Sequence, residues 1–312
     1  MKMLTRTLRY ASGFALTALA ANTAVALEGG TSSYLKGSRD FLGGIVPVEP
    51  GVYMRNDIAY YDGSVDRTLL SGKVQGKIEA RLLVNLIRPT FVTPWELFGG
   101  TYAFGFTLPL VDAKLTGTLV RPKGTNEREE HQDGLGDAIL TPVLLGWHNG
   151  NWHFNSNLSI WVPTGSYKDG RVLNTGKNYW SLSPQVGVTY LNPTTGWDFS
   201  ATGVYLLNFE NSATNYHSGD VLHFDFAAGR SLNKSFKIGV VGYALQQITG
   251  DSGEGATLGD LKARVYGFGP AATLTFPVGN TPVSVTGKYY KEFGAANTTE
   301  GDEAVVSISF KF

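Results

Sequence analysis

The sequence predicts an all-β fold, a transmembrane antiparallel up-and-down β-barrel of about twelve strands that follows an N-terminal non-barrel segment. Three observations predict it: a secretory leader, a strictly alternating last strand that ends in Phe312, and connections that alternate between short and long. In lipid every backbone donor must be paired within the protein, and among β structures only a closed sheet achieves this. One barrel domain over residues 51–312 is therefore expected.

Residues 1–26 have the layout of a signal peptide. Three basic residues precede an apolar run over 14–21, and Ala24-Val25-Ala26 has the small-x-small form of a cleavage site. The mature chain is expected to begin near Leu27. The apolar run is too short to span a bilayer, and no later stretch approaches the roughly 20 apolar residues of a transmembrane helix.

Residues 27–50 show no strand alternation, and their Gly and Pro residues disfavour both a strand and a helix. Two interpretations stay open for this stretch. It is either an ordered periplasmic lead-in to the first strand or a plug in the lumen, in which Tyr34 and Phe41 narrow the path.

Alternating and aromatic-rich runs predict the barrel strands. We expect them at 51–61, 74–92, 99–120, 134–148, 151–163, 178–192, 196–210, 217–232, 235–249, 261–276, 281–293 and 302–312. Short turns alternate with longer connections, of which 62–73, 121–133 and 164–177 are the longest. Short turns on the inside and long loops on the outside are typical of outer-membrane barrels, so both termini are expected in the periplasm.

The last strand shows which side chains face lipid. Its apolar parity holds Ala304, Val306, Ile308, Phe310 and Phe312, and its polar parity holds Glu303, Ser307, Ser309 and Lys311. Trp152, Trp180 and Trp197 fall near strand ends on the predicted lipid face, where an interfacial aromatic girdle belongs.

Prolines inside the predicted strands each remove a ladder donor and predict a bulge or kink. They are Pro89, Pro109, Pro142, Pro184 and Pro270. We favour an adjustment of curvature for most of them. Several kinks on one side of the wall would instead open a lateral exit for a hydrophobic solute.

Charged and polar residues on the predicted inward parity are candidates for a lumen constriction. They are Arg55, Asp57, Glu79, Arg81, His223, Asp225, Arg264 and Lys288. Tyr266 and Phe268 are expected to form a hydrophobic patch in the lumen. The alternative for each charged residue is structural pairing with a neighbouring strand.

Catalysis is disfavoured by the spacing of the polar residues. His153 and Ser159 share one strand and one parity, but six residues place them roughly 20 Å apart, too far for a nucleophile and its base. The absence of Cys excludes thiol catalysis and thiolate metal sites. No catalytic residue, metal site or cofactor is expected, and His223 with Asp225 is interpreted as a polar pair in the lumen.

Four short motifs, in this order, resemble those of one family. They are Glu28-Gly29-Gly30, then Asp40-Phe41-Leu42-x-Gly44 with Pro50-Gly51-x-Tyr53, then Gly134-x-Gly136-Asp137 with Pro142, and Val162-Pro163-Thr164-Gly165-x-Tyr167. The family is named "Putative MetA-pathway of phenol degradation" and consists of outer-membrane transporter-like barrels often associated with uptake of aromatic or other hydrophobic compounds. The resemblance implies a channel or transport role and supplies no numbered ligand-binding residue.

Two functions stay open. The favoured one is a channel for passive uptake of small hydrophobic compounds, aromatic ones included; the alternative is a structural or surface-interaction barrel without a conducting pore. Expected partners are the solute, outer-membrane lipid and lipopolysaccharide, and the barrel assembly machinery, which would engage Phe312. The 26 basic and 26 acidic residues cancel, which disfavours nucleic acid as a partner. The expected location is the outer membrane of a Gram-negative bacterium.

Overall fold

The computed structural model describes residues 26–69, 74–122 and 124–312, so the expected signal peptide lies outside the described residues except for Ala26. A short 3₁₀ helix, η1 (Glu28–Gly30), precedes a 13-stranded sheet. Its strands are β1 (Gly51–Leu69), β2 (Val74–Leu97), β3 (Gly100–Arg121), β4 (Gly124–Leu135), β5 (Ala138–Asn149), β6 (Trp152–Val162), β7 (Ser181–Leu191), β8 (Trp197–Asn208), β11 (Val221–Ser231), β12 (Phe236–Gln247), β13 (Arg264–Val278), β14 (Thr281–Ala296) and β15 (Glu300–Lys311). The two-residue strands β9 (Glu210–Asn211) and β10 (Tyr216–His217) pair separately.

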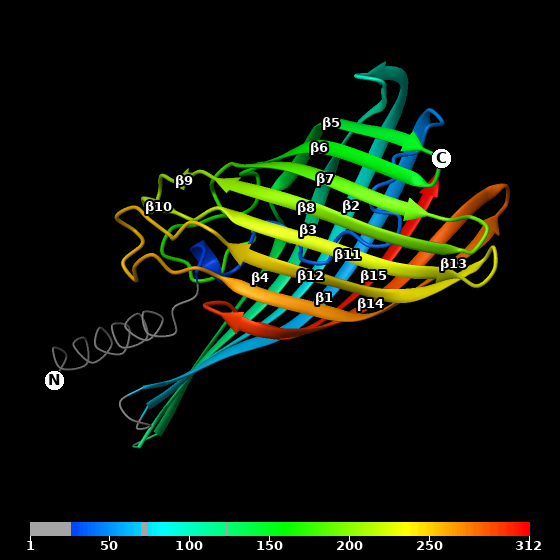
Figure 1. Cartoon of the computed structure of the whole chain (residues 1–312). Coiled ribbons are helices and arrows are strands. Elements are labelled where there is room, and N and C mark those ends of the chain that lie inside the picture. Colours follow the sequence, from blue (N-terminus) through cyan, green and yellow to red (C-terminus); the bar gives the residue numbers. More distant parts are fainter. Residues whose placement is uncertain (1–25, 70–73, 123) are drawn as a thin grey trace, which may run out of the picture.

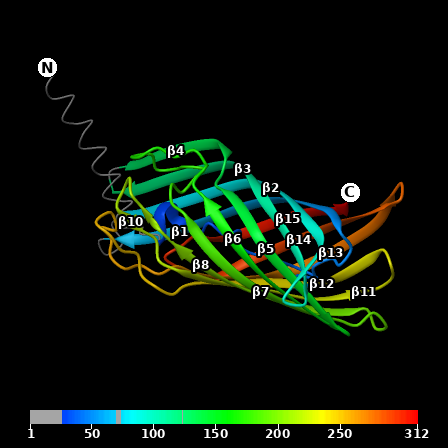
Figure 2. The same ribbon diagram turned by 90° about the horizontal axis from the view of Figure 1, so that it is seen from above.

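Antiparallel pairing runs around the whole sheet, and the pairing of β2 with β3 closes it (Figure 1 and Figure 2). β4 and β5 share one place in the wall, because one half of β3 pairs with β4 and the other half pairs with β5. The predicted closed antiparallel barrel of 12 strands is therefore confirmed.

Two hairpins extend beyond the barrel and correct two expected loops. Residues 62–69 continue β1, and residues 124–133 belong to β4, where the sequence predicts connections. Figure 1 shows the paired ends of β1 with β2 and of β3 with β4 projecting from the barrel. Most of β4 is exposed, so it needs no apolar face, and the alternation that would reveal a strand is missing.

The two ends of the described chain lie at opposite ends of the barrel. Tyr53 pairs with Lys311, so the start of β1 and Phe312 share the end with the short turns. Ala26 lies at the long-loop end, where its N–H donates to Asn297 O (2.7 Å). The prediction that both termini share one end is therefore wrong for Ala26 and Phe312. Residues 26–50, the lumen segment, run the length of the barrel instead of leading into β1 from one side.

The barrel interior is packed around the lumen segment. Tyr34 packs with Val204 and Val265, Phe41 with Val241 and Tyr243, and Val46 with Val92 and Ala103. On the outer face Trp152, Trp180 and Trp197 are exposed, and on β15 Val306 is exposed while Glu303 and Ser307 are buried. No helix among the described residues is long and apolar enough to cross a membrane.

Four of the strand prolines coincide with breaks in the pairing. The β2–β3 pairing skips Arg88 and Pro89, and the register of β5 and β6 shifts beside Pro142. The β7–β8 pairing skips Ser183 and Pro184, and the β13–β14 pairing skips Pro270. Proline has no N–H to donate, so the ladder cannot continue unchanged through these positions.

Candidate functional site

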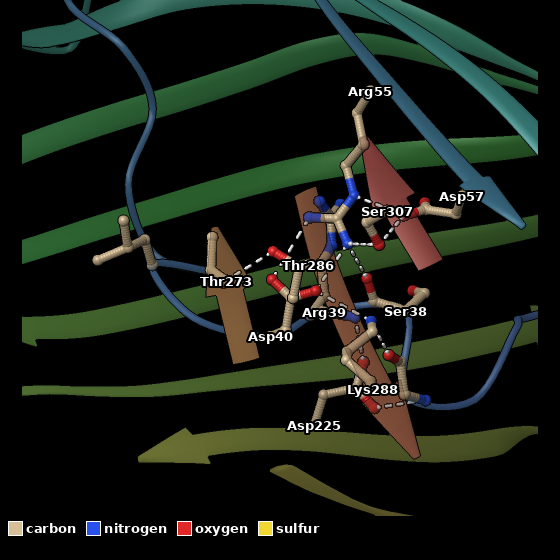
Figure 3. Close-up of polar contacts among 12 residues, drawn as sticks. Ser38, Arg39, Asp40, Arg55, Asp57, Asp225, Thr273, Thr286, Lys288 and Ser307 are labelled. Atoms are coloured by element: carbon tan, nitrogen blue, oxygen red, sulfur yellow. Dashed lines mark hydrogen bonds and ion pairs between the residues drawn. The ribbon is translucent and has the colours of Figure 1, made fainter. Parts of the chain in front are cut away.

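The lumen segment is fixed by an ion-pair network near the middle of its length (Figure 3). Asp40 Oδ2 accepts hydrogen bonds from Arg55 Nη2 (2.8 Å) and Lys288 Nζ (2.9 Å). Burial alone would raise the pKa of the Asp40 carboxyl, but the two cations and the hydrogen bonds that they donate lower it to about 2. Asp40 is therefore held ionised against β1 and β14.

Asp57 extends this network into the wall. It accepts from Arg55 Nε (2.8 Å) and Ser307 Oγ (2.6 Å), and it forms an ion pair with Arg88 on β2 (3.1 Å). The Arg55 guanidinium thus bridges one carboxylate of the lumen segment and one of the barrel, a geometry that suits the forked donors of arginine.

Asp225 on β11 binds the lumen segment from another strand. Its carboxylate accepts from Tyr34 Oη (2.7 Å) and from the backbone N–H groups of Gly37 and Arg39 (3.2 Å each). Nearby, His223 Nε2 lies 2.9 Å from Ser32 Oγ, and its ring packs 4.7 Å from that of Tyr34. We call the inward-facing Arg55, Asp57, Arg88, Asp225 and Lys288 the charged wall.

Neutral groups form most contacts between the lumen segment and β6, β7 and β8, together with Arg39 Nη2, which donates to Gln185 Oε1 (3.4 Å). Gly44 N–H donates to Thr189 Oγ1 (2.8 Å), Leu42 N–H donates to Ser200 Oγ (3.0 Å), and Asn155 Nδ2 donates to Gly43 O (2.7 Å). β8 also carries the buried Asp198, which pairs with Lys237 of β12. We call six neutral inward-facing residues of β6, β7 and β8 the amide–hydroxyl wall. They are Asn155, Asn157, Ser159, Gln185, Thr189 and Ser200.

The long-loop end of the lumen segment is anchored separately. Asn211 Nδ2 donates to both carboxylate oxygens of Glu28 (2.9 Å each), and Lys177 Nζ donates to the backbone oxygens of Glu28 (2.8 Å) and Thr31 (2.9 Å). Burial lowers the pKa of the Lys177 ammonium to about 8, although the Glu28 and Asp137 carboxylates oppose this shift. This end is therefore tied to the loops that follow β6 and β8.

An apolar recess of about 410 Å³ lies in the wall where the β7–β8 ladder is interrupted. Its outer lining includes Pro184, Val186, Gly203, Tyr205, Leu222 and Phe224, and the inward-facing Gln185, Val204 and His223 also border it. Ser183 Oγ, beside the interruption, is buried and has no hydrogen-bond partner among the described residues. We call this feature the outer recess.

Five of the predicted constriction residues converge on the lumen segment or its network. They are Arg55, Asp57, His223, Asp225 and Lys288. Tyr34 and Phe41 also lie inside the barrel, where Tyr34 binds Asp225 and Phe41 packs in the core.

Three predicted constriction residues lie elsewhere. Glu79 pairs with Lys77 and Arg81 pairs with Asp62, on the face of the β1–β2 hairpin opposite the buried Ala80. Arg264 is exposed at the start of β13 and donates to Gly294 O (3.3 Å). A shift of one residue in the parity of a strand moves every side chain to the other face, and β2 and β13 show this error.

The predicted aromatic lumen patch is also corrected. Phe268 is 46% exposed and stacks on Phe226 outside the barrel, and Tyr266 shares its parity. The inward positions in the first part of β13 are Val265, Gly267 and Gly269, and Thr273 and Thr275 follow on the same parity. The first three are small or apolar because Tyr243 and the lumen segment fill the space in front of them, so polar inward residues begin only at Thr273.

Sequence reasoning missed several residues that the fold brings into the interior. Arg88 joins Asp57, and Lys36 of the lumen segment contacts Glu292. Glu292 shares its parity with Lys288, a signal that could have found it. His148 and His153 also meet, Nδ1 to Nδ1 at 2.7 Å, as directly opposed residues of β5 and β6. Among the described residues no group of three or more His, Cys, Asp or Glu could hold a metal ion.

Comparisons with known proteins agree with this architecture. The crystal structure of the COG4313 outer membrane channel from Pseudomonas putida F1 is similar over 86% of this chain and 97% of that chain, with a TM-score of 0.64 and 13% identity. A FadL homologue from Pseudomonas aeruginosa (TM-score 0.47, 6% identity, 93% and 99% covered) aligns less well. A TodX monoaromatic hydrocarbon channel mutant also aligns less well, with a TM-score of 0.41 and 6% identity over 93% of this chain and 98% of that chain. No curated protein matches the sequence.

The family comparison covers most of the barrel. The sequence pattern of one family matches residues 66–308, from the outer part of β1 to the middle of β15. This range includes the amide–hydroxyl wall and most of the charged wall, and it leaves out the lumen segment. The chain belongs to the family described as "Putative MetA-pathway of phenol degradation".

Proposed function

We propose that this protein is an outer-membrane channel for passive uptake of small hydrophobic compounds, aromatic ones included. One observation carries the proposal: the lumen is filled by a pinned, ionised segment, while an apolar recess lies in the wall beside it. An ionic interior penalises an apolar solute, because its ion pairs would lose their partners or their water. The outer recess offers such a solute apolar contact on the lipid side.

The proposed path therefore begins at the long-loop end and leaves the barrel sideways at the interruption beside Pro184. Nothing in this path calls for an energy source, since consumption of the solute inside the cell maintains its gradient. The lumen segment serves as a plug in this scheme, and Tyr34 and Phe41 close the axial route. The proposal assigns no catalytic residue and no cofactor.

A matched pair of glycine substitutions tests the lateral path. A Cβ at Gly203 meets only Val186 Cγ2 (3.8 Å), so Gly203→Leu would fill the outer recess without a clash. Gly287 on β14 is equally open, with nothing within 4 Å, and Gly287→Leu serves as the control. We expect Gly203→Leu to slow uptake of a radiolabelled aromatic compound by intact cells, and Gly287→Leu to leave it unchanged. Equal uptake by cells with Gly203→Leu and cells with Gly287→Leu would contradict the proposed lateral path.

Truncation tests the plug and the alternative function together. Single-channel conductance of the purified barrel is expected to be low and to rise when residues 27–50 are deleted. No conductance in either form, combined with unchanged uptake in cells that lack the protein, would favour a structural or surface-interaction barrel. The filled interior of the barrel is the observation that supports a structural or surface-interaction role.

We further infer that the end with Phe312 and the short turns faces the periplasm of a Gram-negative cell. This would let the exposed Phe312 engage the barrel assembly machinery and would place the long loops near lipopolysaccharide. The chain has no Cys, so single cysteines give an unambiguous test. Asp169→Cys in a long loop should react with an impermeant maleimide on whole cells, and Thr194→Cys in a short turn should not. The reverse result would invert the orientation.

A further inference from the structure

Lys36 of the lumen segment occupies a pocket that none of the roles above explains. Its ammonium pairs with Glu292 and lies 4.7 Å from the ring centre of Tyr61 and 5.8 Å from that of Tyr243. Tyr61 Oη and Tyr243 Oη each donate to Glu292 (2.8 Å each). A positive charge near two ring faces and a carboxylate is the arrangement by which proteins recognise ammonium groups.

The strands build this pocket in two adjoining rows. Glu303 on β15 is paired with Tyr61 on one side and Tyr290 on the other. In the second row Glu292 is paired with Gly267, which in turn is paired with Tyr243. We call Tyr61, Tyr243, Tyr290, Glu292 and Glu303 the tyrosine–glutamate cage.

Glycines make room for the rings of the cage. A Cβ at Gly267 would lie 2.5 Å from Tyr243 Cε1, and a Cβ at Gly63 would lie 2.5 Å from Tyr61 Cζ. Gly37, next to Lys36, has φ +63°, and its Cβ would lie 2.6 Å from Tyr290 Cζ. The lumen segment can therefore approach the cage this closely only with glycine at position 37.

The cage holds a second carboxyl group, that of Glu303, besides the Glu292 carboxylate that pairs with Lys36. Glu303 is 1% exposed, and neither of its carboxylate oxygens has a hydrogen-bond partner among the described residues. An anchor for one lysine would need only Glu292, and the two free oxygens of Glu303 give the pocket further polar atoms that a bound ammonium group could contact.

We propose that the tyrosine–glutamate cage is a binding site for primary ammonium ions, and that Lys36 is its tethered occupant. A free alkylammonium ion presents the same three N–H donors and the same apolar stem as the lysine side chain. The Lys36 side chain is 17% exposed, so the cage is open to solvent on one side. An amine that displaces Lys36 would loosen the lumen segment. This inference goes beyond the proposed uptake role, because ligand binding is measurable whether or not the barrel transports.

Lys36→Ala tests the site, with n-propylammonium as the probe because it replaces the atoms that the substitution removes. Calorimetry on the folded full-length barrel should show saturable binding of n-propylammonium to Lys36→Ala and none of n-propanol. Lys36→Met refills the cage without charge and should not bind. Lys291→Ala, which removes a lysine from an exposed ion pair, should not create a site.

Adding Glu292→Gln to Lys36→Ala should weaken binding by about tenfold or more, since a charge-assisted hydrogen bond is lost. Heat-modifiable migration on gels verifies that each variant is a folded barrel. Equal binding to Lys36→Ala and Lys291→Ala, or equal binding of propanol and propylammonium, would overturn the site. In the wild-type protein, propylammonium chloride should speed amide exchange of residues 34–44 beyond the effect of sodium chloride. Unchanged exchange would overturn the claim that a free ammonium competes with Lys36.

Discussion

The charged wall and the amide–hydroxyl wall hold the same segment by different physics. On the charged wall Asp40 binds Arg55 and Lys288 at 2.8–2.9 Å, and the side chains of Asp40 and Lys288 are buried while that of Arg55 is half-buried. On the amide–hydroxyl wall the segment is held by neutral hydrogen bonds that its backbone donates to Thr189 and Ser200. Breaking a buried ion pair costs several times more than breaking a neutral hydrogen bond, so the segment is attached more firmly on one side.

The outer recess borders the neutral side. Gln185 belongs to the amide–hydroxyl wall and also lines the recess, whereas the ion pairs of Asp40 lie on β1 and β14. Loss of the Gly44–Thr189 or the Asn155–Gly43 hydrogen bond leaves no buried ion unpaired. The lumen segment is therefore held by ion pairs on the charged wall and can detach from the amide–hydroxyl wall at a lower cost in free energy.

The largest effect is expected for Asp40→Asn on the charged wall. Lys288, whose side chain is fully buried, loses its ion-pair partner, which should weaken docking of the lumen segment by about 3–5 kcal/mol. Amide exchange of residues 36–44 measures this free energy. Glu49→Gln is the control, because Glu49 is exposed and pairs with Lys311 near the rim, and it should cost at most about 1 kcal/mol. Equal effects of Asp40→Asn and Glu49→Gln would contradict a firm attachment of the lumen segment by the ion pairs of Asp40.

We expect acid to weaken the contacts of the lumen segment with the charged wall but not its contacts with the amide–hydroxyl wall. The pKa of Asp40 falls from 3.8 to about 2 in the docked state, so its ionised form favours docking. This stabilisation is complete above pH 3.8 and is lost as the pH falls through about 2, and it amounts to about 2 kcal/mol. Conductance should therefore stay low at pH 5 and rise near pH 2. A rise already at pH 5 would show that another group controls docking.

A Cβ at Gly44 should push the segment off the amide–hydroxyl wall. It would lie 2.5 Å from Val188 C, a backbone atom that cannot move aside, so Gly44→Ala should weaken docking by about 1–3 kcal/mol. At Gly43 the closest backbone atom would be Asp40 O at 3.1 Å, and Gly43→Ala should have a smaller effect. Amide exchange compares the two variants, and the reverse order would refute the close approach.

The smallest effect is expected for Thr189→Val. It keeps the shape of the side chain but removes the acceptor of Gly44 N–H and the partner of Ser200 Oγ, at a cost of about 1 kcal/mol. Thr286→Val breaks the Thr273–Thr286 pair, which does not bond to the segment, and should leave docking unchanged. A cost for Thr189→Val equal to that of Asp40→Asn would erase the difference between the walls.

Much of the barrel is predictable because period-2 alternation and turn residues act locally. The strand from Glu303 to Phe312 and the short turns follow directly from these signals. β4 could not be predicted, since its residues 124–133 pair only with β3 and project away from the lipid. A polar strand that leaves the membrane has no apolar face to reveal it.

The site was half predictable for the same reason. Parity was right for Arg55, Asp225 and Lys288, where polar and apolar positions alternate cleanly. It failed on β2 and β13, where charged residues lie on the outer face of a projecting hairpin or at a rim. The path of the lumen segment has no periodic signal at all, because it is set by contacts such as Tyr34 with Asp225, 191 residues apart.

Residues 26–50 pass through the barrel from one end to the other, and this path constrains the order in which the segment and the strands can assemble. A barrel that closed first would have to draw a chain end and several charged side chains through an interior already lined with ion-pair partners. Closure between β1 and β15 is more easily the last event, after the strands have wrapped around the segment. Refolding in vitro should then be slower for the full chain than for a form that begins at Gly51, and an affinity tag placed before Ala26 would emerge on the opposite side of the membrane from one placed after Phe312.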